Sequence, residues 1–402
     1  MNGESLATGQ RSLGDPSITY PLWPPLTSGC PRTSTPELAY PLEVTYDYAR
    51  VDKSLFDQQA GPDLARWAPL LPPLDAPTLG EGGTPLLEFD GVFVKDESRN
   101  PTWSHKDRLN RVAVSAAVHV GAPGVVVASS GNHGASAAAY AARAGLGAIV
   151  LTSDEAPPAV QSFVRSYGAQ VLTLPVEDRW PALRQIVERL GYHPVSNTTV
   201  THTGHPFGAE GYKTIAYELF TQLGTAPAAV FCPTGYAELL FGVWKGFTEL
   251  HALGITASTP RVFSCETAAA GPHARALATG VPATVVELGP TDAYGIDCAA
   301  GGYRGLRAVR DSGGEALLLT DEELRAAQTA LSRQGLWVEL SSAAGLAGYR
   351  KLARAFDGPV VCVTTSSGFK DIGVGEPIPE GQSLSQILSG PIAAKPSGAS
   401  PS

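Results

Sequence analysis

The sequence predicts an α/β protein with parallel sheets, because apolar segments of two kinds alternate along the chain. Short β-branched runs such as residues 124–130 and 359–365 lie between longer segments, such as residues 209–224, whose apolar residues recur at helical spacing. The turns between them are short, as is usual where helices connect parallel strands. One such series precedes residue 205 and another follows it, which indicates two open α/β domains with a ligand site in the cleft between them.

The first series starts with a helix whose beginning is marked by Ser104 and Asp107, a possible capping box. Apolar residues recur on one face of this helix until Gly121. The remaining expected elements are a strand at 124–130, a small-residue helix at 135–145, a strand at 148–152, a helix opened by Pro157 and Pro158, a strand at 169–174 and a helix at 178–190.

The second series begins near residue 208 and repeats the alternation. Its expected elements are a helix at 209–224, a strand at 228–233, a helix at 239–250, a strand at 261–266, helices at 320–335 and 341–356 and a buried strand at 359–365.

Both ends of the chain are rich in Pro, Ser, Thr and Gly, so residues 1 to about 40 and about the last twenty are expected to be loose tails. The predicted division is an N-terminal extension that is partly disordered, a large domain in two pieces, a smaller domain and a disordered tail. Their bounds are 1–75, then 76–109 with 206–380, then 110–205, then 381–402.

Composition narrows the choice of partners and compartment. A formal net charge of −9 argues against nucleic acid or an anionic membrane as a partner. No apolar run approaches the ~20 residues that span a bilayer. The first residues lack the basic start and apolar stretch of a secretory signal, so a cytoplasmic protein is expected.

The five cysteines are scattered and never spaced as C-x-x-C, and most lie beside apolar residues. A disulfide framework or a metal site is therefore not expected. The motifs of dinucleotide-binding proteins, P-loop proteins, serine hydrolases and HExxH metalloproteases are also missing.

Lys106 is the first chemically suggestive residue. The segment KDESRNPTWSHKDR places it where a loop enters a helix, and the electropositive start of a helix can lower the pKa of an amine and favour imine formation. The alternative is that Lys106 and Arg108 are surface charges beside Asp107.

Three loops at strand ends could bind polar groups. SSGNHG, residues 129–134, could hold a carboxylate or form an Asn-capped turn. PTGYAELLFG, residues 233–242, could receive a phosphate, although Glu238 would bring a negative charge close to it. The hydroxyls of residues 364–367 could serve a ring nitrogen or cap the next turn.

Taken in this order, the segments resemble the threonine synthase group of the fold-type II (tryptophan synthase β-like) pyridoxal-phosphate enzymes over about residues 78–372. The segments that carry the resemblance are TLGEGGTPLLEF, VKDESRNPTWSHKDR, EGYKTIAYEL, WKGF, VRDSGG and WVELSSAAGLAG.

The resemblance implies that pyridoxal 5'-phosphate is the cofactor and that Lys106 holds it as a Schiff base and acts as general base. The other implied cofactor contacts are Asn132 at the ring hydroxyl, Thr365 at the ring nitrogen, and the phosphate loop Gly235, Tyr236, Ala237, Glu238 and Leu239. The implied substrate contacts are Ser129, Ser130 and Gly131 at the α-carboxylate, together with His133 and His105. Glu339 matches a family acid to which no role is assigned.

Several departures from the group bear on the substrate. His105 stands where threonine synthases usually carry Phe, SSGNHG is closer to a dehydratase loop, and the phosphate loop is poor in Gly. Cys30 lies in GCP without the paired cysteines that some relatives use for zinc. The arginine-containing segment that relatives carry before SGG is missing, with Arg304 the nearest candidate. Lys213 and Arg108 could each bind a second phosphate, or be solvated surface charges.

The leading functional hypothesis is a lyase that converts O-phosphohomoserine to threonine. The alternatives are a serine or threonine dehydratase or a β-replacement synthase on a serine-type substrate, and, more remotely, a binding module without activity. A hydroxyl at Thr365, in place of a carboxylate, is expected to favour elimination over transamination. The resemblance also implies a homodimer.

Overall fold

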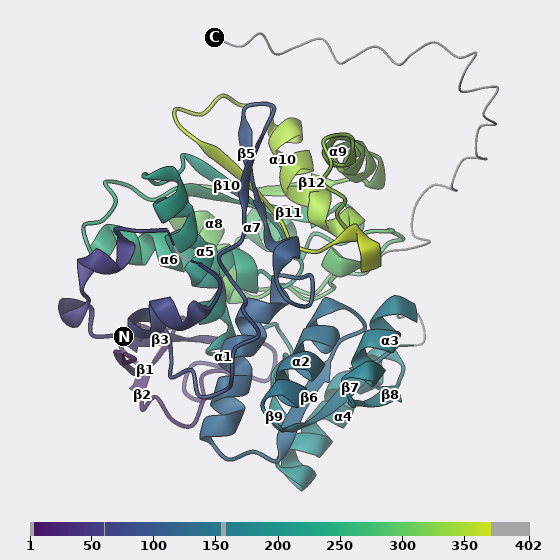
Figure 1. The fold of residues 1–402 in the computed structure, drawn as a ribbon. Helices are drawn as coiled ribbons and strands as arrows, with labels where there is room; N and C mark the ends of the chain where they lie inside the picture. The colour runs from purple at the N-terminus through teal and green to yellow at the C-terminus, as the bar shows by residue number, and fades with distance from the viewer. Residues whose placement is uncertain (1–3, 60, 154–157, 371–402) are drawn as a thin grey trace. The chain divides into compact units, whose positions relative to one another are not determined.

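The computed structural model describes residues 4–59, 61–153 and 158–370, in which the strands form three sheets (Figure 1). Neighbouring strands of the two larger sheets are parallel, except for one antiparallel pair at an edge. The predicted class, α/β with two mainly parallel sheets, is confirmed. The expected helices and strands are all present, with ends shifted by a few residues.

The largest sheet has six strands, and helices cover both of its faces. In spatial order the strands are β12 (Ala316–Leu319), β11 (Arg261–Thr267), β10 (Ala229–Pro233), β13 (Val360–Thr364), β5 (Val92–Asp96) and β4 (Leu86–Phe89). Successive side chains of a strand point to opposite faces. Accordingly Val230 and Cys232 pack with helices α5 (Gly208–Leu223), α6 (Glu238–Ala252) and α8 (Tyr303–Ser312). Phe231, between them, packs with helices α9 (Asp321–Arg333) and α10 (Ala344–Leu352).

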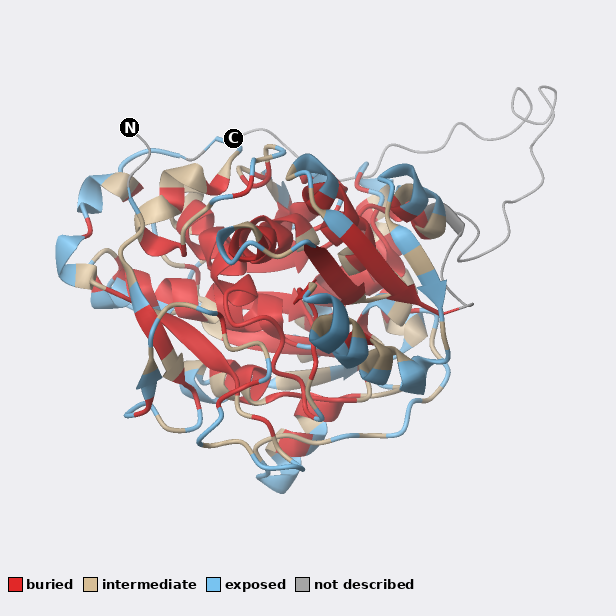
Figure 2. Cartoon of the chain, turned by 90° about the horizontal axis from the view of Figure 1, so that it is seen from below, coloured by how far each residue is buried: buried red, intermediate tan, exposed pale blue. Residues whose placement is uncertain are grey.

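The four-stranded sheet is built in the same way. Its order is β8 (Gln170–Thr173), β7 (Gly147–Thr152), β6 (Gly124–Ala128) and β9 (His193–Pro194). Val125 and Val127 pack with the small residues of α2 (Asn132–Arg143), whereas Val126 packs with Leu183 of α4 (Val176–Leu190). The other described helices are α3 (Pro158–Ser166) and α7 (Pro272–Thr279). Figure 2 shows the buried residues concentrated in the strands and in the helix faces against them.

Helix α1 (Lys106–His119) is held against α5 by a close backbone approach. A Cβ atom at Gly211 would lie 2.0 Å from the carbonyl oxygen of Arg108, so a side chain at this position would force the helices apart. The glycine of the EGYKT segment therefore has a packing reason, and it fixes the first turn of α1, which carries Lys106.

The expectation of a loose N-terminal tail is wrong for the part of it that the structure describes. β1 (Ala7–Ser12), β2 (Thr19–Tyr20) and β3 (Leu42–Tyr46) form an antiparallel sheet. The fully buried Gln10 donates hydrogen bonds to the carbonyls of Pro21 and Pro24, and Lys245 of α6 donates to the carbonyl of Val44. Polar side chains thus hold a segment whose composition predicts little apolar burial. The expected C-terminal tail, 381–402, lies outside the described residues.

Some elements were not predicted, among them β4, β5, α7, α8 and β12. The cysteines are all free and buried. Within the described ranges, no helix is both long and apolar enough to cross a membrane.

Candidate active site

The beginning of α1 is anchored to the carboxyl end of β13. The backbone N–H of His105 donates to the carbonyl oxygen of Thr365 at 2.9 Å, and His105 Nδ1 lies 3.1 Å from the same oxygen. The His105 ring also stacks on Tyr212, with 5.3 Å between the centroids. His105 is therefore held between a strand end and an aromatic ring, and it positions the neighbouring Lys106.

The capping box expected from Ser104 and Asp107 does not form. The helix begins with His105 as its N-cap, and the Asp107 carboxylate instead accepts hydrogen bonds from the backbone N–H of Thr102 at 2.7 Å and from the hydroxyl of Ser136 at 2.6 Å. Asp107 therefore connects α1 to α2, and the Ser104 hydroxyl accepts a hydrogen bond from the backbone N–H of Lys106.

The Lys106 amine is half-buried and lies 5.7 Å from the centroid of the Tyr212 ring. Burial lowers its pKa below the ordinary value, against the opposing effects of Glu238 and Cys298. Lys106 forms no ion pair with any residue in the described part of the chain. The low pKa expected from the helix start is thus present, but its main cause is desolvation.

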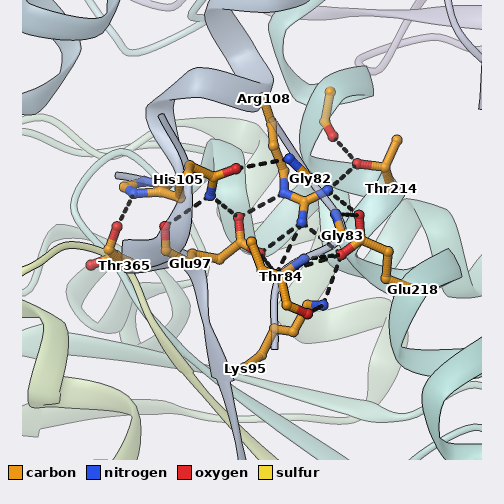
Figure 3. Close-up of polar contacts among 12 residues, drawn as sticks. Gly82, Gly83, Thr84, Lys95, Glu97, His105, Arg108, Thr214, Glu218 and Thr365 are labelled. Atoms are coloured by element: carbon orange, nitrogen blue, oxygen red, sulfur yellow. Dashed lines mark hydrogen bonds and ion pairs between the residues drawn. The ribbon is translucent and has the colours of Figure 1, made fainter. Parts of the chain in front are cut away.

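Figure 3 shows the polar contacts of Arg108 with acids and hydroxyls of the protein, and these make it neither a phosphate donor nor a surface charge. It is fully buried, with Nε 2.6 Å from Glu97 Oε2 and Nη1 2.7 Å from Glu218 Oε1. Its Nη1 also donates to the hydroxyl of Thr214 at 2.8 Å, and Lys95 adds a second cation 2.7 Å from Glu218. The donors of Arg108 are occupied inside the protein.

The other two candidate cations for a second phosphate are also engaged. Lys213 is fully buried, with Nζ 2.7 Å from Glu210 and 2.9 Å from Glu249. Arg304 is buried and donates to the carbonyl oxygens of Leu42 and His205. The expectation that Lys213 could bind phosphate or remain in solvent is wrong, because folding surrounds it with acids.

The Asn132 side chain is held in one orientation by groups from the C-terminal part of the chain. Its Nδ2 lies 3.0 Å from each carboxylate oxygen of Glu339 and donates to them. Its Oδ1 accepts hydrogen bonds from the hydroxyl of Ser366 and from Lys370 Nζ. Glu339, to which the sequence analysis assigned no role, therefore holds the amide that is expected to contact the cofactor ring.

The residues before Asn132 form a half-buried turn at the carboxyl end of β6. The Ser129 hydroxyl accepts from the backbone N–H of Gly131 at 3.2 Å. The Ser130 hydroxyl lies 2.9 Å from that of Ser153 and accepts from Arg179 Nη1 at 3.0 Å. The Ser129 and Ser130 hydroxyls thus lie at the strand end where the sequence predicts a carboxylate cradle, and the cradle stays a prediction.

The expected phosphate loop joins β10 to the first turn of α6. A Cβ atom at Gly235 would lie 2.8 Å from Cys298 Sγ, so the loop passes close to that cysteine. Ala237 adopts a left-handed conformation, with φ of 62°, immediately before the helix. The first N–H groups of a helix have no partner within it and form a site for anions. In this loop Tyr236 is partly exposed, whereas Leu239 is buried.

The Glu238 carboxylate is directed toward the 202–205 loop. It lies 3.8 Å from His202 Nε2 and 4.0 Å from Arg304 Nη1, and the His202 ring stacks on Tyr236 with 4.1 Å between the centroids. Burial raises the pKa of Glu238, against Lys106 and Arg304, which favours its neutral form. The nearby His202 and Arg304 and the raised pKa of Glu238 reduce the electrostatic repulsion between its carboxylate and a bound phosphate.

Thr365 presents its hydroxyl next to a second one. Its Oγ1 lies 2.8 Å from the hydroxyl of Ser342, and both residues are buried. The Ser342 hydroxyl also accepts from the backbone N–H of Ser366. Ser342 belongs to the segment WVELSSAAGLAG but was not singled out from the sequence.

Buried polar atoms near Lys106 test whether the site fits pyridoxal phosphate. His133 Nε2, the Tyr212 hydroxyl and Glu238 Oε1 make no hydrogen bond with the residues that the structure describes. Burial lowers the pKa of His133 to about 3, which keeps its ring neutral. A buried polar atom without a partner costs about 1–3 kcal/mol. Such atoms around a reactive amine suit a polar ligand, and the site fits the cofactor.

The structure brings most of the predicted residues into one region. His105 contacts Thr365, and Ser366, the next residue, contacts both Asn132 and Glu339. The loop after β6 therefore meets the end of β13, so both larger sheets contribute carboxyl ends. Residues that the sequence did not indicate are Tyr212, Arg179, Cys298, Ser342 and Lys370, which lie far apart in the chain.

Comparisons with known proteins agree with this arrangement. The profile of the family described as "Pyridoxal-phosphate dependent enzyme" matches residues 77–367. The chain is 34% identical over 354 residues to threonine synthase of Methanosarcina acetivorans, covering 82% of this chain and 86% of the relative. For threonine synthase of Methanocaldococcus jannaschii the identity is 34% over 359 residues, with 82% and 87% covered.

Solved structures resemble the fold at lower identity. Threonine deaminase isoform 2 of Solanum lycopersicum matches with a TM-score of 0.62 and 22% identity, over 72% of this chain and 86% of that one. Maize serine racemase matches with a TM-score of 0.61 and 20% identity, over 71% and 88%. These two likenesses describe the fold and not the reaction.

Proposed function

Because the chain belongs to the family of pyridoxal-phosphate dependent enzymes and is related to threonine synthases, we propose that it is a lyase that converts O-phosphohomoserine to threonine. Its cofactor is pyridoxal phosphate. The structural observation that carries the proposal is the Lys106 amine, which is half-buried, without an ion-pair partner among the described residues, and lowered in pKa by burial.

Residues from both larger sheets would hold the cofactor. Lys106 would bind it covalently, Asn132 would contact the ring, and the loop 235–239 would bind its phosphate. Thr365 and Ser342 offer the ring nitrogen two hydroxyls in place of a carboxylate. When bound, pyridoxal phosphate stabilises the negative charge left on an amino acid after loss of its α-proton.

Lys106 Nζ is the group that would accept the α-proton. A lowered pKa increases the fraction of neutral amine at neutral pH, and a base is most effective when its pKa lies near the working pH. The turn Ser129–Gly131 would hold the substrate α-carboxylate next to this amine. The neutral His133 ring would offer its Nε2 to the substrate without adding a charge.

The second candidate is a serine or threonine dehydratase. It is favoured by the loop SSGNHG, in which the half-buried His133 follows Asn132 directly. A dehydratase needs no site for a second anion, whereas O-phosphohomoserine carries a phosphate. The two candidates therefore differ in their substrates and in the products they release.

A panel of amino acids incubated with the cofactor-loaded protein tests the proposal, with products identified by mass spectrometry. Release of phosphate and threonine from O-phosphohomoserine is the expected result. Formation of a 2-oxo acid from serine or threonine, without phosphate release from O-phosphohomoserine, would replace the proposal with the dehydratase. A binding module would show no product from any substrate.

A further inference from the structure

Arg179 is a cation beside the site that neither the fold nor the proposed chemistry has used. It lies in the first turn of α4, and its Nη1 donates to the Ser130 hydroxyl at 3.0 Å. Its Nε is buried and makes no hydrogen bond with the residues that the structure describes. The guanidinium is therefore only partly satisfied.

The position of Arg179 follows from the topology of the four-stranded sheet. α4 follows β8, Ser130 follows β6, and the carboxyl ends of parallel strands lie at the same edge of a sheet. The Arg179 charge also acts on Tyr236 of the phosphate loop. Burial and Cys298 raise the pKa of the Tyr236 hydroxyl, and the Arg179 charge opposes that rise. The guanidinium thus contacts the predicted carboxylate cradle at Ser130 and acts electrostatically on Tyr236.

The other charges near Arg179 leave it available. Glu177 and Asp178 precede it on α4 and are exposed, and neither forms an ion pair with it in the described part of the chain. Asp297 also acts on Tyr236 and raises the pKa of its hydroxyl. Arg108 and Lys213 have their donors directed at groups inside the protein, whereas Arg304 donates through its Nη groups to two backbone carbonyls and its Nε makes no hydrogen bond with the described residues.

We propose that Arg179 binds an anionic group at the end of the substrate side chain and so selects phosphorylated or acidic amino acids over neutral ones of the same length. Guanidinium binds phosphate and carboxylate through paired, charge-assisted hydrogen bonds, and Nε with one Nη forms such a pair. When the anionic group binds, Arg179 Nη1 would either share its hydrogen bond between the Ser130 hydroxyl and that group or exchange the hydroxyl for it. This inference rests on the proposed function, because it assumes an amino-acid substrate with its α-carboxylate at residues 129–131.

Two ligands with the same carbon chain test the inference without turnover. One is 2-amino-5-phosphonopentanoate, the analogue of O-phosphohomoserine whose phosphorus cannot leave, and the other is norvaline, which lacks the phosphonate. Both are titrated into cofactor-loaded wild type, Arg179→Gln and Arg179→Lys, with affinity read by calorimetry and by the change in visible absorption. Arg189→Gln, an exposed arginine on the same helix, is the control.

Arg179→Gln is expected to weaken phosphonate binding roughly ten- to hundredfold, which is the effect of losing a charge-assisted contact, and to leave norvaline binding within about twofold. Arg179→Lys should recover part of the loss, and Arg189→Gln should match wild type. Equal weakening of both ligands would show that Arg179 holds the α-carboxylate, and would overturn the inference. Unchanged phosphonate binding would overturn it as well.

The inference and the proposed function fail separately. If wild type releases phosphate from O-phosphohomoserine while Arg179→Gln binds the phosphonate normally, the inference fails and the function stands. If Arg179 is needed for phosphonate binding while no phosphate is released from O-phosphohomoserine, the proposed function fails and the inference that Arg179 selects anionic side chains stands.

Discussion

Lys106 and Arg108 lie two residues apart on the first turn of α1, and their surroundings are opposite. Arg108 is fully buried, and its donors reach Glu97, Glu218 and Thr214 at 2.6 to 2.8 Å. Lys106 is half-buried, with an aromatic ring beside it and no ion pair among the described residues. Both side chains belong to one helix, but only Arg108 is paired with carboxylates.

The difference separates a structural charge from a chemical one. Desolvating an ion pair costs several kcal/mol, which good geometry and extra hydrogen bonds must offset, as they do around Arg108. The Lys106 amine lacks that compensation, so its neutral form is favoured and its nitrogen lone pair becomes available. The carboxylates show the same contrast: the pKa of Glu218 is held low by Arg108 and Lys95 despite burial, whereas burial raises the pKa of Asp107 to about 6.

The largest expected effect is on Lys106. Lys106→Ala should abolish covalent cofactor attachment, with loss of the visible absorption of the bound cofactor, and lower kcat by about a thousandfold or more, because base and attachment point are lost together. Unfolding of the cofactor-free protein in urea should change by less than about 1 kcal/mol, since no ion pair is broken. Lys53→Ala, at an exposed lysine, is the control. If Lys106→Ala kept the visible absorption of the bound cofactor, the contrast between a chemical Lys106 and a structural Arg108 would be wrong.

Arg108→Met should have the reverse profile. It leaves Glu97 and Glu218 buried without their partner, so the free energy of unfolding in urea should fall by about 3–5 kcal/mol. Arg99→Met removes a largely exposed partner of Asp96 and should cost less than about 1 kcal/mol. If Arg108→Met were as stable as Arg99→Met, the view that Arg108 is a structural charge would be wrong.

Glu339→Gln should weaken cofactor binding by about tenfold, because a charged acceptor that orients the Asn132 amide is replaced by a neutral one. Equilibrium dialysis of pyridoxal phosphate against the variant measures this directly. Glu322→Gln, at an exposed acid on α9, should bind like wild type. Equal affinity in Glu339→Gln and wild type would remove Glu339 from the account of the site.

The smallest effect concerns the pH dependence of Asp107. Its pKa rises from 3.8 to about 6 on folding, so between these values the folded chain binds more protons than the unfolded chain. The stability that the raised pKa of Asp107 contributes is fully present below about pH 4 and is lost as the pH rises through about 6. The difference in unfolding free energy between wild type and Asp107→Asn should therefore fall by about 1 kcal/mol from pH 5 to pH 6.

Urea titrations of the two proteins at four pH values give this difference, and the shared titration of the buried histidines cancels in it. A flat difference would mean that the Thr102 and Ser136 hydrogen bonds compensate burial fully.

Much of the fold could be predicted, because the signals were local. The continuous apolar run at residues 228–233 and the helical spacing in residues 209–224 depend only on neighbours in the sequence, and both segments form as expected. The N-terminal sheet was missed because its stability comes from distant partners such as Lys245, which no local pattern reveals. Lys213 was misread because its burial and its pairing with Glu249 of α6 depend on the packing of two helices, although Glu210 is a near neighbour in the sequence.

The sequence by itself determined the α/β class, the family and the segment that contains Lys106, because periodicity and motif order are properties of consecutive residues. Only the tertiary structure decided which charges are neutralised: it placed Arg108 and Lys213 among acids and left Lys106 and Arg179 incompletely paired. The physical reason is that burial and ion pairing depend on distances across the folded chain, where residues 108 and 218 meet at 2.7 Å.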